Sequence, residues 1–486
     1  MSSQPHLPLR AAILEILESR QLLSAYPIFL GGGGTDLASS VAIDKANNIY
    51  YAGTFSGTVD FDPSGATQNL TASGVASTFV AKFSPAGALI WAKRIGGIGS
   101  TSHVYDGTIE RFARLALDGS NNVYIAGSFS GTRDFDPGTG TKNLTGAGQT
   151  DAFICKLNSS GQYVWAKRFG GTSHDHVSGI AVAANGYIYT TGYFRGTADF
   201  DPSASAYRLT SADSGTDIFV ARYSPTGAFS WARRIGASDD DQPFNLALDT
   251  NGNPHICGYF SAQPDFDPGS GVYKLTNKGE VDAFVLKLTT TGGFVWARAF
   301  GGAGIDAATA LDVDQYKNVY ITGAFARTVD FNPGSATNNL TSAGNWDTFV
   351  TKLNSSGNYV TAKRIGGPGN DVSWSLDVRG SALLLGGSFQ GSVDFNPSSS
   401  VYKLTSGGGD DAFFCKLNTS LAFSWARRIG EAQDEWGIAL AVNSSGYVYG
   451  AGLAAADASV DDDSGVEIDS GGNIGLIKYN SSGALA

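Results

Sequence analysis

An acidic residue recurs in this chain about once every 65 residues, at intervals of 74, 65, 66, 65, 65 and 64. The seven positions are Asp36, Glu110, Asp175, Asp241, Asp306, Asp371 and Glu435. Carboxylates held close together repel one another, which raises some of their pKa values or recruits a cation. Calcium, with about six to eight oxygen ligands in flexible geometry, suits such a set better than zinc. The alternative is structural: an acid before a strand accepts backbone N–H bonds and fixes a turn.

Two further groups of side chains have types suited to binding. His174 and His176 flank Asp175, and His103 lies one loop earlier, so these histidines are candidate metal ligands or, alternatively, solvated loop positions. Trp374 and Trp436 accompany two of the acids, Asp371 and Glu435. An exposed tryptophan beside carboxylates is a candidate sugar-stacking residue, and burial between structural units is the alternative.

The motif Asp-Phe-Asp-Pro or Asp-Phe-Asn-Pro occurs six times. The copies begin at Asp60, Asp134, Asp199, Asp265, Asp330 and Asp394. It is too short for an EF-hand loop and lacks that loop's glycine and final glutamate. We expect its proline to set a turn, its phenylalanine to pack inward and its acids to cap backbone groups. One peripheral calcium ion per copy is the alternative.

Sequence signals for catalysis are absent. The chain has no Gly-x-Ser-x-Gly elbow, no His-Glu-x-x-His and no phosphate-binding loop. A net charge of −11 argues against nucleic acid and anionic membranes as partners. The three cysteines are too few for a disulfide framework and are expected to be buried.

The elements that must position these residues repeat with the same period. Each unit contains four stretches rich in β-branched and aromatic residues, bounded by Gly, Asn and Asp, and none has convincing helical periodicity. Four-stranded units that repeat around an axis describe a β-propeller, and the glycine of the second strand occurs seven times: Gly53, Gly127, Gly192, Gly258, Gly323, Gly387 and Gly452. The sequence therefore predicts an all-β, seven-bladed propeller over residues 26–486.

The ring is predicted to close through its N-terminus. The fourth-strand motif Trp-Ala-Lys-Arg-Ile-Gly-Gly and its variants occur six times, and the chain ends where a seventh would begin. Residues 26–32 resemble that motif and can complete the last blade. In a propeller, the loop between blades and the loop between second and third strands open on one face. The seven acids would then ring the mouth of the central channel.

The repeated unit resembles the bacterial SBBP-type β-propeller repeat. The resemblance is carried by Asp-Ala-Phe-Val-x-Lys-Leu, Trp-Ala-Lys-Arg-Ile-Gly-Gly and Ile-Ala-Val-Asp-x-x-Asn-Asn-Val-Tyr, in six of seven units. It implies a seven-bladed propeller of a kind common in secreted or surface proteins, and it implies little chemistry. The seventh unit departs from the pattern, with Asp461-Asp462-Asp463 in place of Asp-Phe-Asp-Pro.

Residues 1–25 lie outside the repeats. The stretch 17–24 resembles a leader motif of exported planctomycete proteins, and a free N-terminal segment is the alternative. No apolar run reaches the length of a membrane span.

Together these observations predict a secreted or cell-surface bacterial protein, a monomer, that acts as a non-catalytic binding scaffold. Its ligand would be a protein or polysaccharide at the acidic face, with calcium as the candidate stabilising ion. The alternatives are a polysaccharide lyase or glycosidase that uses the acidic face, and a purely structural surface or adhesion protein.

Overall fold

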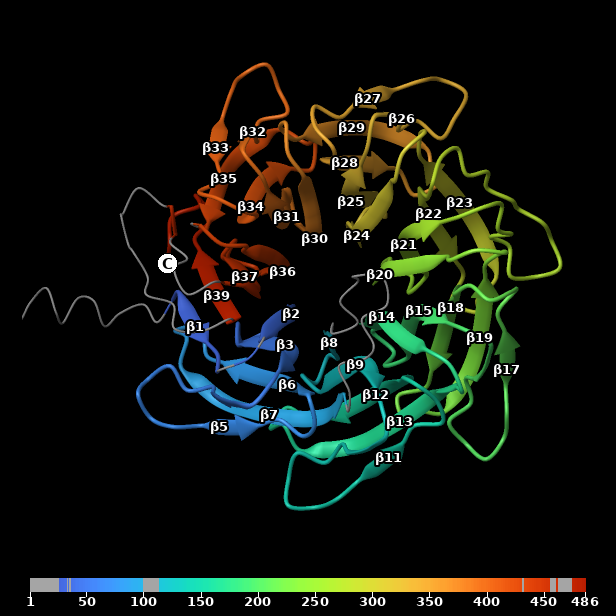
Figure 1. Ribbon diagram of the computed structural model, residues 1–486, viewed down its shortest axis with the longest axis vertical. Coiled ribbons are helices and arrows are strands. Elements are labelled where there is room, and N and C mark those ends of the chain that lie inside the picture. Colours follow the sequence, from blue (N-terminus) through green and yellow to red (C-terminus); the bar gives the residue numbers. More distant parts are fainter. Residues whose placement is uncertain are drawn as a thin grey trace, which may run out of the picture.

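The computed structural model describes residues 26–32, 34, 36–98, 113–430, 432–454, 460–461 and 474–486. In these residues all the regular structure is β-strand, arranged as seven blades around a central axis (Figure 1). The predicted all-β, seven-bladed fold is confirmed. No helix in the described part of the chain is long and apolar enough to cross a membrane.

Each blade is a four-stranded antiparallel sheet whose strands follow one another outward from the axis in chain order, except that the outermost strand of the seventh blade comes from the N-terminus. The innermost strands are β2 (Leu37–Ile43), β8 (Arg114–Leu117), β14 (Asp175–Val182), β20 (Gln242–Leu248), β24 (Ala307–Val313), β30 (Asp371–Arg379) and β36 (Trp436–Val442). The second strands are β3 (Ile49–Phe55), β9 (Val123–Phe129), β15 (Ile188–Phe194), β21 (Pro254–Phe260), β25 (Val319–Phe325), β31 (Ala382–Phe389) and β37 (Val448–Leu453).

The outer half of each blade comes from the later part of its repeat. The third strands are β6 (Ala76–Phe83), β12 (Asp151–Leu157), β18 (Asp217–Tyr223), β22 (Asp282–Leu288), β28 (Asp347–Leu353), β34 (Asp411–Asn418) and β39 (Ile474–Tyr479). The fourth strands are β7 (Leu89–Ile98), β13 (Tyr163–Gly171), β19 (Phe229–Ile235), β23 (Phe294–Phe300), β29 (Tyr359–Ile365), β35 (Phe423–Ile429) and, for the seventh blade, β1 (Ile28–Leu30).

Strand β1 closes the ring as the sequence predicts. It pairs antiparallel with β39, with Ile28 opposite Leu476 and Leu30 opposite Ile474. Ile28 and Leu30 are buried in a core cluster shared by the seventh and first blades. A polar contact supports the same junction, because Lys478 Nζ donates to the carbonyl of Pro85 at 3.1 Å. With β1 in place, the seventh blade has four strands, as the other blades do.

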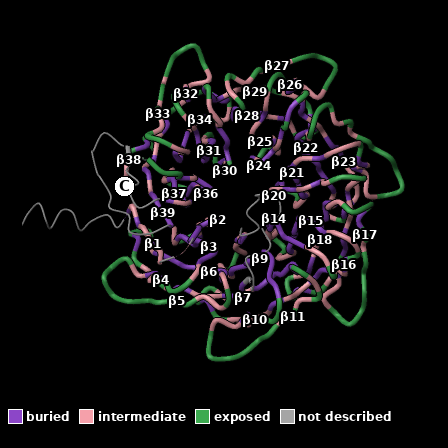
Figure 2. Tube along the Cα trace, in the orientation of Figure 1, coloured by how far each residue is buried: buried purple, intermediate pink, exposed green. Residues whose placement is uncertain are grey.

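The hydrophobic core is distributed between neighbouring blades rather than gathered at the centre. Each cluster draws its buried side chains from two adjacent blades, as in the cluster that joins Ile218 of β18 to Phe260 of β21. Because successive side chains of a strand point to opposite faces, every central strand contributes to two clusters. The exposed residues gather in loops around the outer rim (Figure 2).

The Asp-Phe-Asp-Pro motif builds those outer loops as short two-stranded hairpins in five of its six copies, and in the fourth blade Asp265 makes a single bridge with Lys274. The five hairpins are β4 (Thr58–Asp60) with β5 (Asn69–Thr71), β10 (Thr132–Asp134) with β11 (Asn143–Thr145), β16 (Thr197–Asp199) with β17 (Arg208–Thr210), β26 (Thr328–Asp330) with β27 (Asn339–Thr341), and β32 (Ser392–Asp394) with β33 (Lys403–Thr405). The hairpin of one blade reaches the outermost strand of the preceding blade, as where Gly170 of β13 pairs with Asp199. It thereby covers an edge that would otherwise be open to pairing with another chain.

The side chains of the motif take the structural roles expected of them. Asp60 Oδ1 accepts the backbone N–H groups of Asp62 at 3.0 Å and of Gln68 at 2.8 Å, which fixes the loop. Phe61 is fully buried, with its ring 4.9 Å from that of Phe79. Burying a phenylalanine contributes about 1.5–3 kcal/mol. In the seventh blade, β38 (Val460–Asp461) pairs with β35 at the corresponding place, with Asp461 opposite Arg428.

The tryptophan of the fourth strand links one blade to the next. Trp425 donates its indole N–H to the carbonyl of Ser481 in the seventh blade at 3.3 Å. Its ring lies under Gly483, where φ is +86° and an added Cβ would come within 2.7 Å of the indole. This turn therefore requires glycine for both its backbone conformation and the close approach of the ring.

Candidate functional site

The recurrent acids are buried structural links rather than solvent-facing carboxylates. Asp241 is fully buried; its Oδ2 accepts the N–H of Ala237 at 2.8 Å, and its Oδ1 accepts that of Ser261 at 2.9 Å. The first partner lies in the loop from the preceding blade, and the second follows strand β21 of the same blade. The carboxylates of Asp36, Asp306 and Asp371 join the same two loops in their blades. The other described members, Asp36, Asp175, Asp306, Asp371 and Glu435, are buried as well.

Burial also changes the protonation of these acids. It raises the pKa of Asp175, Asp241 and Asp371 to about 7, despite the opposing effect of their backbone hydrogen bonds. The pKa of Asp306 rises to about 6 for the same reason. These positions match the backbone-bonding alternative. Calcium binding by the series stays a prediction, and its seventh member, Glu110, lies outside the described residues.

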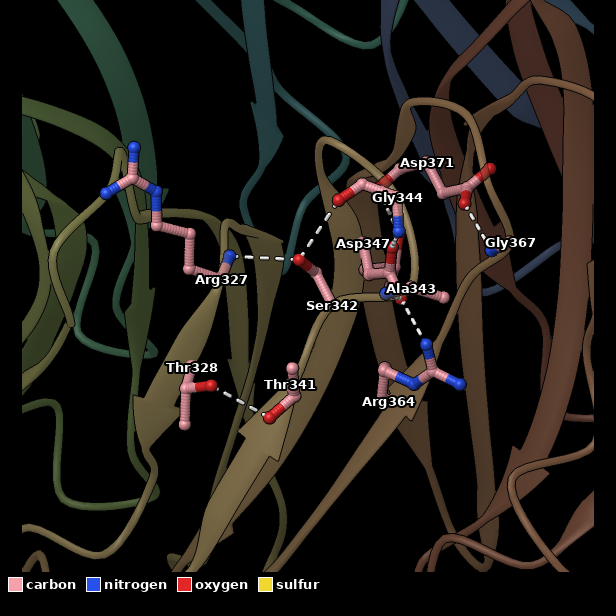
Figure 3. Close-up of polar contacts among 11 residues, drawn as sticks. Arg327, Thr328, Thr341, Ser342, Ala343, Gly344, Asp347, Arg364, Gly367 and Asp371 are labelled. Carbon is pink, nitrogen blue, oxygen red and sulfur yellow. Dashed lines mark hydrogen bonds and ion pairs between the residues drawn. The ribbon is translucent and has the colours of Figure 1, made fainter.

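A second acid in each of five blades, missed in the sequence, supports the first. Asp347, at the start of β28, accepts a hydrogen bond from Arg364 of β29 at 2.7 Å, close to Asp371 (Figure 3). The same pairing joins Asp151 to Arg168, Asp217 to Arg234 and Asp411 to Arg428. The signal was present in the sequence, because the two residues stand 17 apart in every pair, on strands that are antiparallel neighbours.

One blade breaks this pattern. Ala299 of β23 stands where the other four blades carry arginine, so Asp282 has no such partner. Burial raises the pKa of Asp282 to about 6, with Lys278 opposing the shift. Its Oδ1 has no hydrogen-bond partner among the described residues, which is also true of Asp217 Oδ1 in blade three. Blade four therefore differs from its neighbours in the missing arginine.

The two candidate histidines in the described part of the chain, His174 and His176, make separate contacts. The ring of His176 is buried, with Nδ1 3.0 Å from Ser128 Oγ and the ring stacked on Tyr193 at 5.4 Å. Burial lowers its pKa to about 3, so it is neutral. His174 contacts Thr150 instead, with its Nδ1 3.2 Å from Oγ1. No group of three or more His, Cys, Asp or Glu in the described part of the chain is arranged to hold a metal ion. His103 lies outside that part.

The two candidate tryptophans are placed differently. Trp436 donates its indole N–H to Asp410 Oδ2 at 3.1 Å and lines a narrow crevice between the sixth and seventh blades. Trp374 is 37% exposed and lines a large groove on the face where the acids lie. Its orientation comes from a β-bulge: Ser373 pairs with Gly387 and Ser375 with Gly386, so Trp374 is the extra residue.

The same bulge recurs in five other innermost strands, three residues after each recurrent acid, where the extra residues are Ser39, Ser178, Phe244, Thr309 and Ile438. In the second blade the described part of β8 pairs without a bulge, and Ala113 stands at the matching sequence position. Only the fourth and sixth blades place an aromatic side chain there. Thr309, between them, is small and buried. Phe244 and Trp374 therefore project on either side of Thr309, and all three residues line the groove.

This groove has a volume of about 1130 Å³ and extends over the fourth, fifth and sixth blades. Its apolar lining includes Tyr259, whose ring lies 5.7 Å from that of Phe244, and the exposed side chains of Ile305 and Trp346. Trp374 lines both the groove and a smaller cavity of about 130 Å³ around the central axis.

The polar residues of the groove are concentrated at its fourth-blade end. Asp239, Asp240 and Glu280 lie there, with Gln263 and Asn277. Asp240 is fixed, because its Oδ1 accepts from the N–H and Oγ1–H of Thr216 at 2.8 and 3.0 Å. Asp239 and Glu280 are exposed. The described lining contains no Lys, Arg, His or Cys. An apolar concavity with a few convergent polar groups is suited to binding.

The buried acids hold the groove aromatics in place. The N–H of Asp371 donates to the carbonyl of Trp346 at 2.8 Å, and the carboxylate of Asp371 accepts the N–H of Gly367 at 2.7 Å. Trp346 directly precedes Asp347, which is paired with Arg364 (Figure 3). Asp371 and the Asp347–Arg364 pair therefore lie directly beside Trp346 at the edge of the groove.

Comparison with known proteins gives distant relatives. No family model matches the chain, so the resemblance to the SBBP-type repeat stays a prediction. The chain is similar to the uncharacterized WD repeat-containing protein L264 of Acanthamoeba polyphaga mimivirus, with 26% identity over 424 residues that cover 71% of this chain and 29% of that protein. It is similar to the regulatory protein FlaEY of Caulobacter vibrioides, with 24% identity over 357 residues that cover 68% of this chain and 35% of that protein. The chain therefore spans about a third of the length of these relatives.

Two solved structures are also similar. One is a protein of unknown function from Bacteroides caccae, with 12% identity, a TM-score of 0.29, and coverage of 70% of this chain and 94% of that one. The other is Sqt1 from Chaetomium thermophilum, with 10% identity, a TM-score of 0.39, and coverage of 95% of this chain and 85% of that one.

Proposed function

We propose that the protein is a non-catalytic interaction scaffold and that it binds a segment of a partner protein in the groove over blades four to six. The observation that carries this proposal is the break in symmetry at the bulge: aromatic side chains at Phe244 and Trp374 open a groove of about 1130 Å³ on an otherwise repetitive face. That volume exceeds the roughly 300–1000 Å³ of small-molecule pockets and suits an extended chain.

The energetics of the groove agree with a binding role. Trp346 and Trp374 are both 37% exposed, so a ligand would cover apolar surface that now faces water. Exposed tryptophans that become buried commonly dominate the affinity of an interface, with losses above about 1 kcal/mol on truncation. The surrounding strands and buried carboxylates hold these rings before the ligand arrives, which lowers the ordering cost of binding.

The relatives are compatible with this proposal, since one is described as WD repeat-containing and the other as regulatory. We also propose export to the cell surface and stabilisation by calcium, and these two parts of the proposal are supported by the sequence alone. A polysaccharide-acting enzyme would have to use acids other than the buried recurrent series, and the exposed carboxylates Asp239 and Glu280 are the ones available in the groove.

A selection experiment tests the groove. Peptides are selected from a displayed random library on the wild-type protein, and their affinities are measured by calorimetry. The double variant Phe244→Ser with Trp374→Ser should bind them about tenfold or more weakly. Serine is already the bulge residue of the first and third blades, at Ser39 and Ser178, so the variant should keep the wild-type melting temperature.

A matched control is Ile90→Ser, which removes a side chain that is 49% exposed on the fourth strand of blade one. It should bind the selected peptides as the wild type does. Peptides that bind equally to the groove variant would contradict the proposal. Binding or turnover of a polysaccharide that depends on the same two residues would instead favour the carbohydrate alternative.

A further inference from the structure

We propose that the segment bound in the groove is cationic at one end and apolar at the other, and that Asp239 and Glu280 recognise its lysine or arginine side chains. This inference rests on the proposed function and specifies the chemistry of the partner. It follows from how charge and apolar surface are distributed along the groove.

The carboxylates occupy one end of the groove. Asp239 and Asp240 come from the loop that enters blade four, and Glu280 from the loop before β22 in the same blade. The described lining holds no basic residue to neutralise them, and the chain as a whole carries a formal charge of −11. A cationic group reaching this end would meet a negative potential both locally and from the whole molecule.

The neighbouring rings favour the same kind of group. Phe244 and Tyr259 line the groove within blade four, the blade that carries the carboxylates at this end. An ammonium or guanidinium group over an aromatic face is attracted by the ring, and guanidinium also stacks on it. Acidic and aromatic side chains together therefore select for lysine and arginine and disfavour a carboxylate or phosphate, which would be repelled.

The opposite end has a different character. Trp346 and Trp374 line the groove over blades five and six, whereas Ile305 pairs with Val281 and so lies beside the loop that carries Glu280. A ligand that spans the groove would place its charge over blade four and its aliphatic or aromatic side chains over blades five and six. This arrangement fixes the direction of the bound segment as well as its composition.

Asp240 has a separate role in this arrangement. Its carboxylate is held by Thr216, so it contributes charge from a fixed place, whereas Asp239 and Glu280 are exposed and free to turn toward a ligand. Exposed ion pairs are individually weak, and their main effects are on specificity, association rate and salt dependence. The charge preference should therefore weaken as ionic strength rises.

The test compares two synthetic peptides of equal length, one with lysines and leucines and one with glutamates in place of the lysines. Binding is measured by fluorescence anisotropy at ionic strengths of about 0.01 M and 0.15 M. The lysine peptide should bind about tenfold or more tightly at the lower ionic strength, and the preference should shrink at the higher one. The variant Asp239→Asn with Glu280→Gln should lose most of the preference, with a two- to fivefold loss of affinity per carboxylate, roughly as for exposed ion pairs.

A control of equal net charge is available within the chain. Asp62→Asn with Asp136→Asn removes two carboxylates from the outer hairpins, and asparagine already stands at the matching positions Asn332 and Asn396. This control should keep the lysine preference. Equal losses in both variants would overturn the inference, because they would reflect net charge rather than the groove.

The two proposals fail in different ways. If library peptides depend on Phe244 and Trp374 but are neutral or acidic, the cationic inference fails and the protein-binding groove stands. If the lysine peptide binds equally to the variant Phe244→Ser with Trp374→Ser, both fail. A neutral glucan that binds in the groove in preference to either peptide also overturns the inference.

Discussion

Asp312 and Asp377 occupy the same position in neighbouring innermost strands, and their carboxyl groups hydrogen-bond each other. The same position is alanine in the other five blades, at Ala42, Ala116, Ala181, Ala247 and Ala441. Each acid also accepts a backbone N–H of the next blade: Asp312 Oδ2 from Val378 at 2.9 Å and Asp377 Oδ2 from Val442 at 2.7 Å. The fifth, sixth and seventh blades are thus linked by carboxyl groups.

This pair makes the stability of the protein depend on pH. Burial and the charge of Asp377 raise the pKa of Asp312 to about 8, whereas an unfolded aspartate has a pKa near 4. Between about pH 4 and about pH 8 the native state therefore holds a proton that the unfolded state has lost. The free energy of unfolding should fall as pH rises through this window, with a slope of up to about 1.4 kcal/mol per pH unit for this proton.

Urea unfolding of the wild type and of Asp312→Asn across that pH range measures the effect. Asparagine can still donate to Asp377 and accept from Val378 but does not titrate. The variant should lose part of the slope and become the more stable protein at the alkaline end. Parallel curves for the two proteins would contradict the assignment. The raised pKa values of Asp175, Asp241 and Asp371 should leave a residual slope of the same sign.

The fold could be predicted from the sequence because its determinants repeat. Seven copies of the second-strand glycine set the number of blades, and the unpaired seventh unit required residues 26–32 to close the ring. The buried position of Phe61 and the loop-fixing hydrogen bonds of Asp60 also followed, since a residue present in almost every copy serves the architecture. These inferences are strong because each of them is supported by almost every copy of the repeat.

The groove could not be predicted in the same way, because it depends on where repeats differ. Trp374 and Trp436 both accompany a recurrent acid, but they stand three residues and one residue after it, respectively. The extra residue of the bulge is the one three positions after the acid, and it interrupts the side-chain alternation of the strand. Trp374 consequently projects into the groove, and Trp436 turns toward Asp410. Phe244, the extra residue of the same bulge in β20, was not singled out in the sequence.

The calcium prediction has a direct test in thermal unfolding. An ion that binds only the native state stabilises it by mass action, by about 2.7 kcal/mol at a concentration 100 times its dissociation constant. If calcium is bound, EDTA should lower the melting temperature, and added Ca²⁺ should restore it. An identical melting curve with EDTA would remove calcium and leave the buried acids with their backbone hydrogen bonds as their role.

The closing strand should contribute to global stability. Leu30→Ala removes a buried side chain from the cluster shared by the first and seventh blades. A cavity of this kind costs about 2–5 kcal/mol. The control Val272→Ala shortens a side chain that is 72% exposed and should leave the urea midpoint unchanged. Equal midpoints for Leu30→Ala and the wild type would mean that the ring is stable without β1.

Blade four offers the opposite kind of change, a stabilising substitution. Ala299→Arg would restore the arginine that the other four blades place opposite this acid, and the carboxyl group of Asp282 would gain a charged partner. The equivalent Arg364 keeps 35% of its side chain exposed, so the new guanidinium would be partly solvated as well. A hydrogen bond to a charged group contributes about 1.5–3 kcal/mol, and solvent screening reduces it here to about 1 kcal/mol.

The increase in the free energy of unfolding caused by Ala299→Arg should appear only at pH values at which Asp282 is ionised. The pKa of Asp282 is raised to about 6, so the wild-type carboxyl is protonated and tolerates burial at pH 5 but is charged at pH 8. Urea unfolding should therefore show little difference at the lower pH and a more stable variant at the higher one. The reverse change, Arg364→Ala, should lower the free energy of unfolding, and more so at the higher pH. It removes the arginine partner of Asp347, so that Asp347, like Asp282, would have no arginine opposite it. A stabilisation by Ala299→Arg that is equal at both pH values would mean that packing, and not the carboxylate, is responsible.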